Sequence, residues 1–300
     1  MSPTGFTIAP LAAGTFTADR ISRTRHDYHT HPLFELAALN GLARNLARVD
    51  KCRFVRPGTT QASEFSTAGE SPDGRDIDEV FARMEEPGSW IALYNVENDP
   101  TYRRFLQELT GNVRALVEPS QPGVFNVQGF IFISAPPSVT PFHIDRENNF
   151  WLQVRGRKVI TLWDHEDRLA APQAGVEEFI VEHNLRHVRL DDAVAARGTS
   201  YDVGPGDGLY FPSTTPHMTR SDRTWCTPGD GISISIGVVF YTETTRRHAK
   251  IHACNALLRR AGLLPRPPGH SSLDGAKAAL GGALVVAKKR LRGWTPPPGF

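Results

Sequence analysis

Residues 140–158 read TPFHIDRENNFWLQVRGRK, and this stretch indicates both the fold and the chemistry of the chain. Side chains in a β-strand alternate between its two faces, so His143 and Asp145 can point to the same side. An imidazole and a carboxylate on one face can bind a single metal ion. The HxD pattern by itself is weak, because it occurs by chance in many chains.

A third ligand has to come from another part of the chain, and the run LYFPSTTPHMTRS at residues 209–221 offers His217. This histidine lies just beyond an expected strand at residues 209–211. Two imidazoles and a carboxylate on one face of an octahedron leave three positions open, as non-haem Fe(II) oxygenases require. We therefore predict that His143, Asp145 and His217 form a metal site. The alternative is that they are ordinary polar residues of strands and loops without a metal.

Strand periodicity extends on both sides of this stretch. Short runs rich in β-branched and aromatic residues occupy residues 124–134, 148–156, 158–163, 206–212 and 231–241. Proline and glycine punctuation separates them, as in PPSVTP and PGDG. Several such strands within about 120 residues predict an antiparallel sandwich or barrel.

Helical periodicity is found before and after the strands. We expect helices at residues 33–49, 98–113, 244–262 and 274–294, and a loop or connector at residues 56–78. In the second of these helices, Asp99 is the expected cap, Pro100 suits the first position and Gly111 is the expected terminator. The chain is therefore expected to be mostly β with flanking helices.

The run HIDRENNFWLQVRGRK resembles the Jumonji C (JmjC) family of Fe(II)- and 2-oxoglutarate-dependent oxygenases, and is most similar to the type that hydroxylates an asparagine of hypoxia-inducible factor. The resemblance is close over residues 140–163 and looser over residues 206–217 and 231–241. The residues at the offsets of the family motif are Thr140, His143, Asp145, Asn149, Phe150, Gln153, Gly156 and Lys158.

The resemblance implies a double-stranded β-helix, also called a jelly roll or cupin barrel, with helical N- and C-terminal additions. It implies that His143, Asp145 and His217 hold Fe(II), with O2 and 2-oxoglutarate as cosubstrates. Lys158 and Thr140 then hold the distal carboxylate of 2-oxoglutarate. Such a carboxylate, once buried, needs a cation and a hydroxyl donor, and Lys158 is otherwise unusual in the apolar run KVITLW.

The resemblance also points to further cosubstrate contacts. Asn149 is expected near the metal-chelating end of 2-oxoglutarate, although asparagine is also common in turns. Family members often supply a tyrosine from an earlier strand, and this chain has Ala92 at that position. Tyr94 has the same strand parity and is the candidate substitute. The alternative is that Tyr94 is a core residue. Gly237 stands where the asparaginyl hydroxylase type has an asparagine. Lys158 could also be a lysine whose ammonium reaches solvent at a sheet edge.

The implied function is hydroxylation of a C–H bond in a peptide or protein residue, an amino acid or a small metabolite, with release of succinate and CO2. N-demethylation begins with the same hydrogen abstraction and is the alternative outcome. A cupin module that binds metal without turnover, and a cupin isomerase or a dioxygenase that uses no 2-oxoglutarate, remain as other classes.

Composition is that of an ordinary globular protein, with 40% hydrophobic and 22% charged residues among 300. No stretch approaches the roughly 20 apolar residues of a membrane span. The three cysteines are far apart and too few for a disulfide scaffold, and no basic leader precedes the first apolar run. We therefore expect a cytoplasmic protein.

Three regions follow from these patterns: an N-terminal helical or irregular lead-in at residues 1–85, the β core at 86–245 and a basic helical extension at 246–300. The extension carries a net charge of +10 and the rest of the chain −8. Its last helix has an apolar stripe opposite Lys288 and Lys289, formed by Ala279, Leu280, Ala283, Leu284, Val286, Ala287 and Leu291. We expect this helix to pack on the barrel or on a second subunit of a homodimer, with a nucleic acid or an anionic membrane as the alternative partner.

Two other groups of histidines are candidates for a metal site. His26, His29 and His31 lie close together in RHDYHTHP, where a packed or surface segment is the favoured interpretation. His183 and His187 have the spacing of a helical zinc pair, but the general-base glutamate of HExxH is absent. We therefore do not expect a second metal ion.

Overall fold

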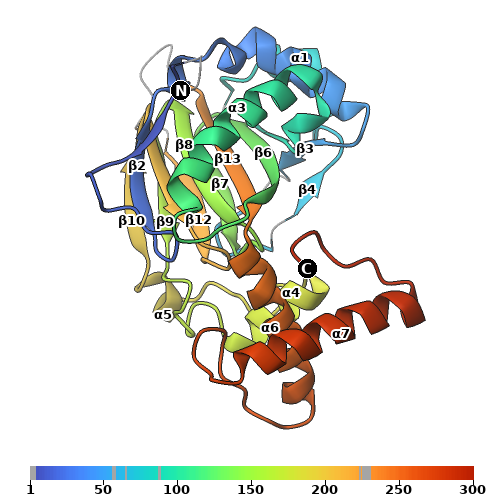
Figure 1. Ribbon diagram of the computed structural model, residues 1–300. Coiled ribbons are helices and arrows are strands. Elements are labelled where there is room, and N and C mark those ends of the chain that lie inside the picture. Colours follow the sequence, from blue (N-terminus) through green and yellow to red (C-terminus); the bar gives the residue numbers. More distant parts are fainter. Residues whose placement is uncertain (1–4, 56–58, 65, 87–88, 223, 225–230) are drawn as a thin grey trace.

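Two antiparallel β-sheets form the centre of the molecule (Figure 1). The structure is a computed structural model that describes residues 5–55, 59–64, 66–86, 89–222, 224 and 231–300. The larger sheet has nine strands, in the order β1 (Ile8–Pro10), β2 (Ser22–His26), β11 (Asp207–Phe211), β8 (Asn148–Arg155), β13 (Ser233–Tyr241), β6 (Phe125–Ser134), β5 (Trp90–Leu93), β3 (Cys52–Val55) and β4 (Thr67–Ala68). The smaller has four, in the order β10 (Thr199–Val203), β9 (Lys158–Leu162), β12 (His217–Ser221) and β7 (Ser138–His143).

Eight of these strands make up a double-stranded β-helix. Along the chain, β6, β8, β11 and β13 lie next to one another in the larger sheet, while β7, β9, β10 and β12 form the smaller one. Strands that pass back and forth between two facing sheets define a jelly roll. The predicted fold class is therefore confirmed, and each expected strand between residues 124 and 241 is present.

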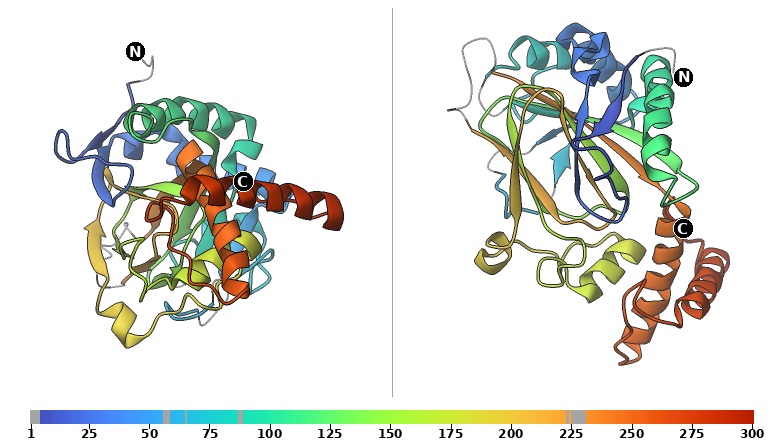
Figure 2. Two further views of the ribbon diagram at one scale, coloured as in Figure 1. Left: turned by 60° about the horizontal axis from the view of Figure 1, so that its bottom comes forward. Right: turned by 60° about the vertical axis from the view of Figure 1, so that its left-hand side comes forward.

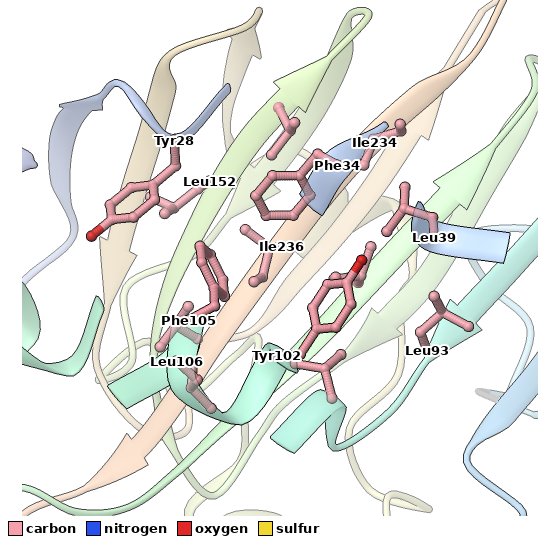
Figure 3. Close-up of a cluster of buried hydrophobic side chains, with 14 of the residues drawn as sticks. Tyr28, Phe34, Leu39, Leu93, Tyr102, Phe105, Leu106, Leu152, Ile234 and Ile236 are labelled. Carbon is pink, nitrogen blue, oxygen red and sulfur yellow. The ribbon is translucent and has the colours of Figure 1, made fainter. Parts of the chain in front are cut away.

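The outer face of the larger sheet is covered by helices α1 (Leu36–Ala47) and α3 (Pro100–Val117) (Figure 1). Ile234 and Ile236 of β13 belong to the same hydrophobic core as Leu39 and Phe105 from these helices (Figure 3). Successive side chains of a strand point to opposite faces, so the residues that alternate with Ile234 and Ile236 along β13 face the smaller sheet. This alternation separates an apolar outer core from an interior that carries polar groups.

The remaining helices are α2 (Ile77–Ala82), α4 (Gln173–Glu182), α5 (Asp192–Ala195), α6 (Glu243–Arg260) and α7 (Asp274–Arg292). Figure 2 shows α6 and α7 extending beyond one end of the barrel, with α7 lying across α6. The two backbones meet at Gly281, where a methyl group would overlap the Lys250 carbonyl oxygen. Glycine at this position therefore allows the close crossing.

The N-terminal region contains strands that the sequence patterns did not predict. The expected helix is present as α1, but β1 and β2 extend the larger sheet beside β11, and β3 pairs with β5. These strands are short, and the expected connector at residues 56–78 holds β4 and the first residues of α2. Within that connector, residues 56–58 and 65 lie outside the described residues.

Gly111 does not end α3, contrary to expectation. Asp99 caps the helix through its carboxylate, which accepts hydrogen bonds from the backbone N–H groups of Thr101 and Tyr102, and Pro100 is the first residue as predicted. The helix continues to Val117 because Val113 and Val117 are fully buried. Their burial outweighs the cost of about 1 kcal/mol for a glycine in a helix.

His183 and His187 do not lie on one helix. His183 has a left-handed backbone conformation with φ 58° and ends α4, so His187 falls in the loop that follows. The imidazoles therefore lack the helical i, i+4 arrangement that their spacing suggested.

Cys52 and Cys254 are buried free thiols, while Cys226 lies outside the described residues. In the part of the chain that the structure describes, no helix is both long and apolar enough to cross a membrane.

Candidate metal centre

The three predicted metal ligands lie at one end of the smaller sheet. His143 is the last residue of β7, and Asp145 lies two residues beyond the strand rather than within it. His217 begins β12, a strand that was not predicted, and pairs directly with His143. Cross-strand partners lie on the same face of a sheet, so this pairing brings the two imidazoles together.

The ligand atoms of these residues surround one point. The Nε2 atoms of His143 and His217 lie 3.9 and 3.4 Å from the two carboxylate oxygens of Asp145. One ligand atom from each residue lies within 4.8 Å of the others. Among the described residues no other group of three histidine, cysteine or acidic side chains meets this criterion, and neither histidine group at 26–31 or 183–187 does.

Backbone carbonyls orient both imidazoles. The Nδ1 atom of His143 lies 2.7 Å from the Pro141 carbonyl oxygen, and that of His217 lies 3.0 Å from the Thr215 carbonyl oxygen. A carbonyl can only accept a hydrogen bond, so Nδ1 carries the proton and the Nε2 lone pair is directed to the carboxylate. This is the tautomer and the outer hydrogen bond typical of metal-ligating histidines.

His217 is kept neutral by its surroundings. Burial lowers its pKa to about 4, and the neighbouring His143 lowers it further. The charge of Asp145 acts in the opposite direction. A metal ligand must be deprotonated, so a low pKa favours binding. Two imidazole nitrogens and one carboxylate fit Fe(II) or a similar transition metal.

Lys158 faces the same interior as the metal ligands. On β9, Ile160 and Leu162 pair with Thr219 and His217 of β12, and Lys158 has the same parity. The lysine lies four residues along the strand from the His217 row, about 13 Å at 3.3 Å per residue. This separation along the strand is comparable to the combined length of a lysine side chain and a short dicarboxylate.

The ammonium of Lys158 ends in a group of hydroxyls. The side chain is 2% exposed, and Nζ donates a hydrogen bond to Ser134 Oγ at 3.4 Å. The hydroxyl of Ser138 lies 2.9 Å from that of Ser134 and 2.6 Å from that of Ser221. Within the described part of the chain, no carboxylate forms an ion pair with Lys158. Burial lowers its pKa to about 8.

Those serines come from three different strands, and the sequence analysis missed them. The signal for Ser134 was present in FIFIS, where residues 130, 132 and 134 share the inner face of β6. For Ser138 and Ser221 the signal is their cross-strand pairing, which appears only in the sheet. A cation among hydroxyl donors is a suitable site for a carboxylate.

Thr140 lies between the lysine and the metal ligands, and Asn149 lies near the metal ligands. Thr140 pairs with Thr219 on the interior face. Asn149 pairs with Phe211, whose ring centroid is 4.9 Å from that of His217, and its Oδ1 atom is buried without a partner. A side chain at Gly237 would begin 3.4 Å from that oxygen, so glycine leaves room for the asparagine.

Tyr94 lies one residue after β5, in an aromatic group with Phe130 and Phe132 at centroid distances of 5.3 and 6.4 Å. Burial raises the pKa of its hydroxyl, and the charge of Asp145 raises it further. The tyrosine thus lies within electrostatic range of the metal ligands, whereas Ala92 is fully buried.

No protein-family model matches the chain, and neither does any curated protein. Among solved structures, it is similar to Escherichia coli YcfD, with a TM-score of 0.47 and 16% identity over 90% of this chain and 65% of that one. Another structure, of the E. coli ribosomal oxygenase YcfD with cobalt and 2-oxoglutarate, has a TM-score of 0.44 and 16% identity over 87% of this chain and 62% of that one.

A third similar structure is the non-haem α-ketoglutarate-dependent epimerase SnoN of nogalamycin biosynthesis, with a TM-score of 0.42 and 14% identity over 76% of this chain and 79% of that one. The chain spans about three fifths to two thirds of the length of the YcfD chains that it matches. Likenesses at these TM-scores assign no function, so the assignment depends on the side chains of the site.

Proposed function

We propose that the chain is an Fe(II)- and 2-oxoglutarate-dependent oxygenase that hydroxylates a C–H bond of a peptide or protein residue, an amino acid or a small metabolite. The observation that carries the proposal is Lys158, a buried cation among hydroxyls on the face that also holds the metal ligands. The resemblance of residues 140–163 to JmjC oxygenases supports the same class. Membership of the asparaginyl hydroxylase type, and a cytoplasmic location, remain predictions.

Bound Fe(II) would supply O2 activation, with one oxygen atom going to succinate as 2-oxoglutarate loses CO2 and the other to the substrate as a hydroxyl group. His143, Asp145 and His217 would hold the metal. Lys158 and Thr140 would hold the distal carboxylate, and Asn149 and Tyr94 would contact the cosubstrate nearer the metal. The protein thereby orients the reactants and excludes water from them.

Lys158 also separates this proposal from other classes. A cupin that only binds metal has no cosubstrate carboxylate to place beside that ammonium. An unpaired buried cation is costly, so its presence indicates an anionic ligand. Asp145 counts against the three-histidine centres that are commoner in those other cupins. Hydroxylation and N-demethylation share the first step and differ only in the substrate.

The direct test is production of succinate from 2-oxoglutarate in the absence of a prime substrate. The protein is loaded with Fe(II) under anaerobic conditions and then exposed to air. We expect succinate only when iron, 2-oxoglutarate and O2 are all present, and its absence would contradict the assignment. Mass spectrometry of a cell extract treated with the enzyme then identifies the substrate by the gain of one oxygen atom.

Affinity for 2-oxoglutarate is expected to fall at alkaline pH. Burial lowers the pKa of Lys158 to about 8, so the free protein loses the ammonium proton as the pH rises through that value. The dissociation constant should be nearly constant below about pH 7.5 and rise about tenfold for each further pH unit above 8. Calorimetric titration across this range checks it, and a flat profile would contradict the role of the ammonium. The Lys158→Met variant is the control and should show no such rise.

We also propose a homodimer formed through α7. The helix packs on α6 through Asp274, Lys277 and Gly281, so much of its apolar stripe faces outward. Leu280, Val286 and Leu291 are 49%, 48% and 85% exposed. Covering such an apolar stripe stabilises an interface by removing its surface from water.

Light scattering at micromolar concentration should give the mass of a dimer, and the Leu280→Glu/Leu291→Glu double variant should give a monomer. Leu264→Glu is the matched control, since Leu264 is 87% exposed but lies in the loop after α6. A monomeric parent protein would rule out the dimer and leave a nucleic acid or an anionic membrane as the partner of the basic helix.

A further inference from the structure

A second cavity, of about 120 Å³, lies where the metal-bearing end of the barrel meets α6. Basic residues from three segments line it: Arg146 directly after the metal ligand Asp145, His165 and Arg168 after β9, and His248 and His252 on α6. Gly299 and Phe300 of the C-terminal segment also line it. None of these groups has a role in the function proposed above.

The two arginines have no acidic partner. Arg146 donates a hydrogen bond to the Phe179 carbonyl oxygen at 2.9 Å, and Arg168 donates one to the His165 carbonyl oxygen, also at 2.9 Å. Neither forms an ion pair with a carboxylate of the described residues. A guanidinium has five N–H donors, and the buried Nε of Arg146 has no partner. Both cations therefore retain N–H donors, although the charges of Glu166, Asp164, Glu177 and Asp167 act on Arg168 without a direct ion pair.

Acidic side chains near the cavity are engaged elsewhere. Glu166 lies 3.0 Å from His270, and Asp274 lies 3.5 Å from Lys277. Glu147 accepts a hydrogen bond from the Tyr241 hydroxyl. Asp19 is 68% exposed and lies 3.9 Å from Arg20. The cavity wall thus carries two guanidinium groups, while the carboxylates named here have other partners.

His252 is a buried side chain of α6 on the wall of the cavity. It is 7% exposed, and its Nδ1 atom has no hydrogen-bond partner. Burial lowers its pKa to about 3, and the charges of His248, Arg168 and Lys277 contribute.

We propose that this cavity is a binding site for a small oxyanion, such as inorganic phosphate or a small carboxylate. Guanidinium groups bind both kinds of oxyanion through paired, charge-assisted hydrogen bonds. A cavity of about 150 Å³ admits benzene, so one of this size suits an anion of about five or six non-hydrogen atoms. It has no room for a nucleotide.

This site is separate from the interior that ends at Lys158. It is connected to the metal centre through the loop of Asp145, whose carbonyl oxygen accepts a hydrogen bond from the Thr214 N–H at 2.8 Å. Arg146 and Thr214 both line the cavity. A bound oxyanion therefore contacts the segments that position a metal ligand.

Calorimetric titration of the full chain with inorganic phosphate, at constant ionic strength and without 2-oxoglutarate, tests the proposal. We expect one binding site, and Arg168→Gln should weaken it about tenfold to a hundredfold, because hydrogen bonds to charged groups are strong. Arg189→Gln is the matched control, since Arg189 is exposed and also donates to a carbonyl oxygen. A parallel titration with acetate distinguishes a site for phosphate from one for oxyanions in general.

Two further variants keep the result interpretable. Ala249 lines the cavity and is 7% exposed, so Ala249→Leu reduces the space without changing the charge and should also weaken binding. Lys158→Met should leave phosphate binding unchanged, whether or not the chain is an oxygenase. The proposal is overturned if the parent protein does not bind phosphate at millimolar concentrations, if both cavity variants bind like the parent, or if Lys158→Met abolishes binding.

Discussion

Lys158→Met should lower the affinity for 2-oxoglutarate by roughly two to three orders of magnitude. Removal of one partner of a buried ion pair typically costs about 3–5 kcal/mol, and each 1.4 kcal/mol corresponds to about a tenfold change in affinity. Methionine keeps an apolar stem of similar length, so the change removes the charge with little loss of packing. Succinate production measured against the concentration of 2-oxoglutarate gives the result.

Iron affinity should hardly change in this variant, because His143, Asp145 and His217 are untouched. Lys289→Met is the matched control, since it makes the same substitution at an exposed position of α7. A Lys158→Met protein with the concentration dependence of the parent would remove Lys158 from the cosubstrate site. It would also leave the buried ammonium without an explanation.

The same variant should unfold at a higher temperature than the parent at neutral pH. Burial lowers the pKa of Lys158 from 10.5 to about 8, so between these values the unfolded chain binds more protons than the folded one. Stability of the parent therefore rises with pH across this window, and the ammonium costs stability below it. The difference in melting temperature should shrink as the pH rises from 8 to 10. A variant less stable than the parent at pH 7 would show that Lys158 is already paired in the folded protein.

His217→Ala should abolish turnover and weaken Fe(II) binding while leaving the fold intact. Loss of an outer hydrogen-bond partner of a metal ligand typically costs 10–100-fold in affinity or activity, and loss of the ligand itself should exceed that. Iron binding is measured under anaerobic conditions, and turnover is measured as succinate formation.

Circular dichroism and thermal unfolding establish that the variant is folded. His187→Ala is the control, because His187 is exposed and forms no part of the metal group. Full activity of His217→Ala would exclude His217 from the site, and equal losses in both variants would point to a general effect on the fold.

Local sequence patterns were sufficient for the central part of the molecule. The strands from residue 124 to 241 alternate in a way that a jelly roll requires, and the helices at both ends have clear apolar periodicity. The candidate metal ligands could be named because HxD and a later histidine occur together with a surrounding motif that resembles that of JmjC oxygenases. Lys158 could be singled out because a charged residue in an apolar strand needs a partner.

Sequence patterns did not predict those elements whose formation depends on contacts with distant segments of the chain. The strands β1 to β4 are short, and they are stabilised by neighbours such as β11 and β5 rather than by their own composition. Gly111 has the character of a helix terminator, but α3 continues because its later residues pack on the sheet. Such packing energies are tertiary and exceed local propensities.

The sequence by itself thus determined the β core, the residues proposed as metal ligands and the unusual lysine, because each depends on residue type and local spacing. Only the tertiary structure decided that Ser134, Ser138 and Ser221 meet around Lys158 and that α7 exposes its apolar stripe. It also decided that Arg146 and Arg168 share a cavity with histidines of α6. These contacts join residues far apart in the chain, and the order and register of strands that bring them together are not encoded in any one segment.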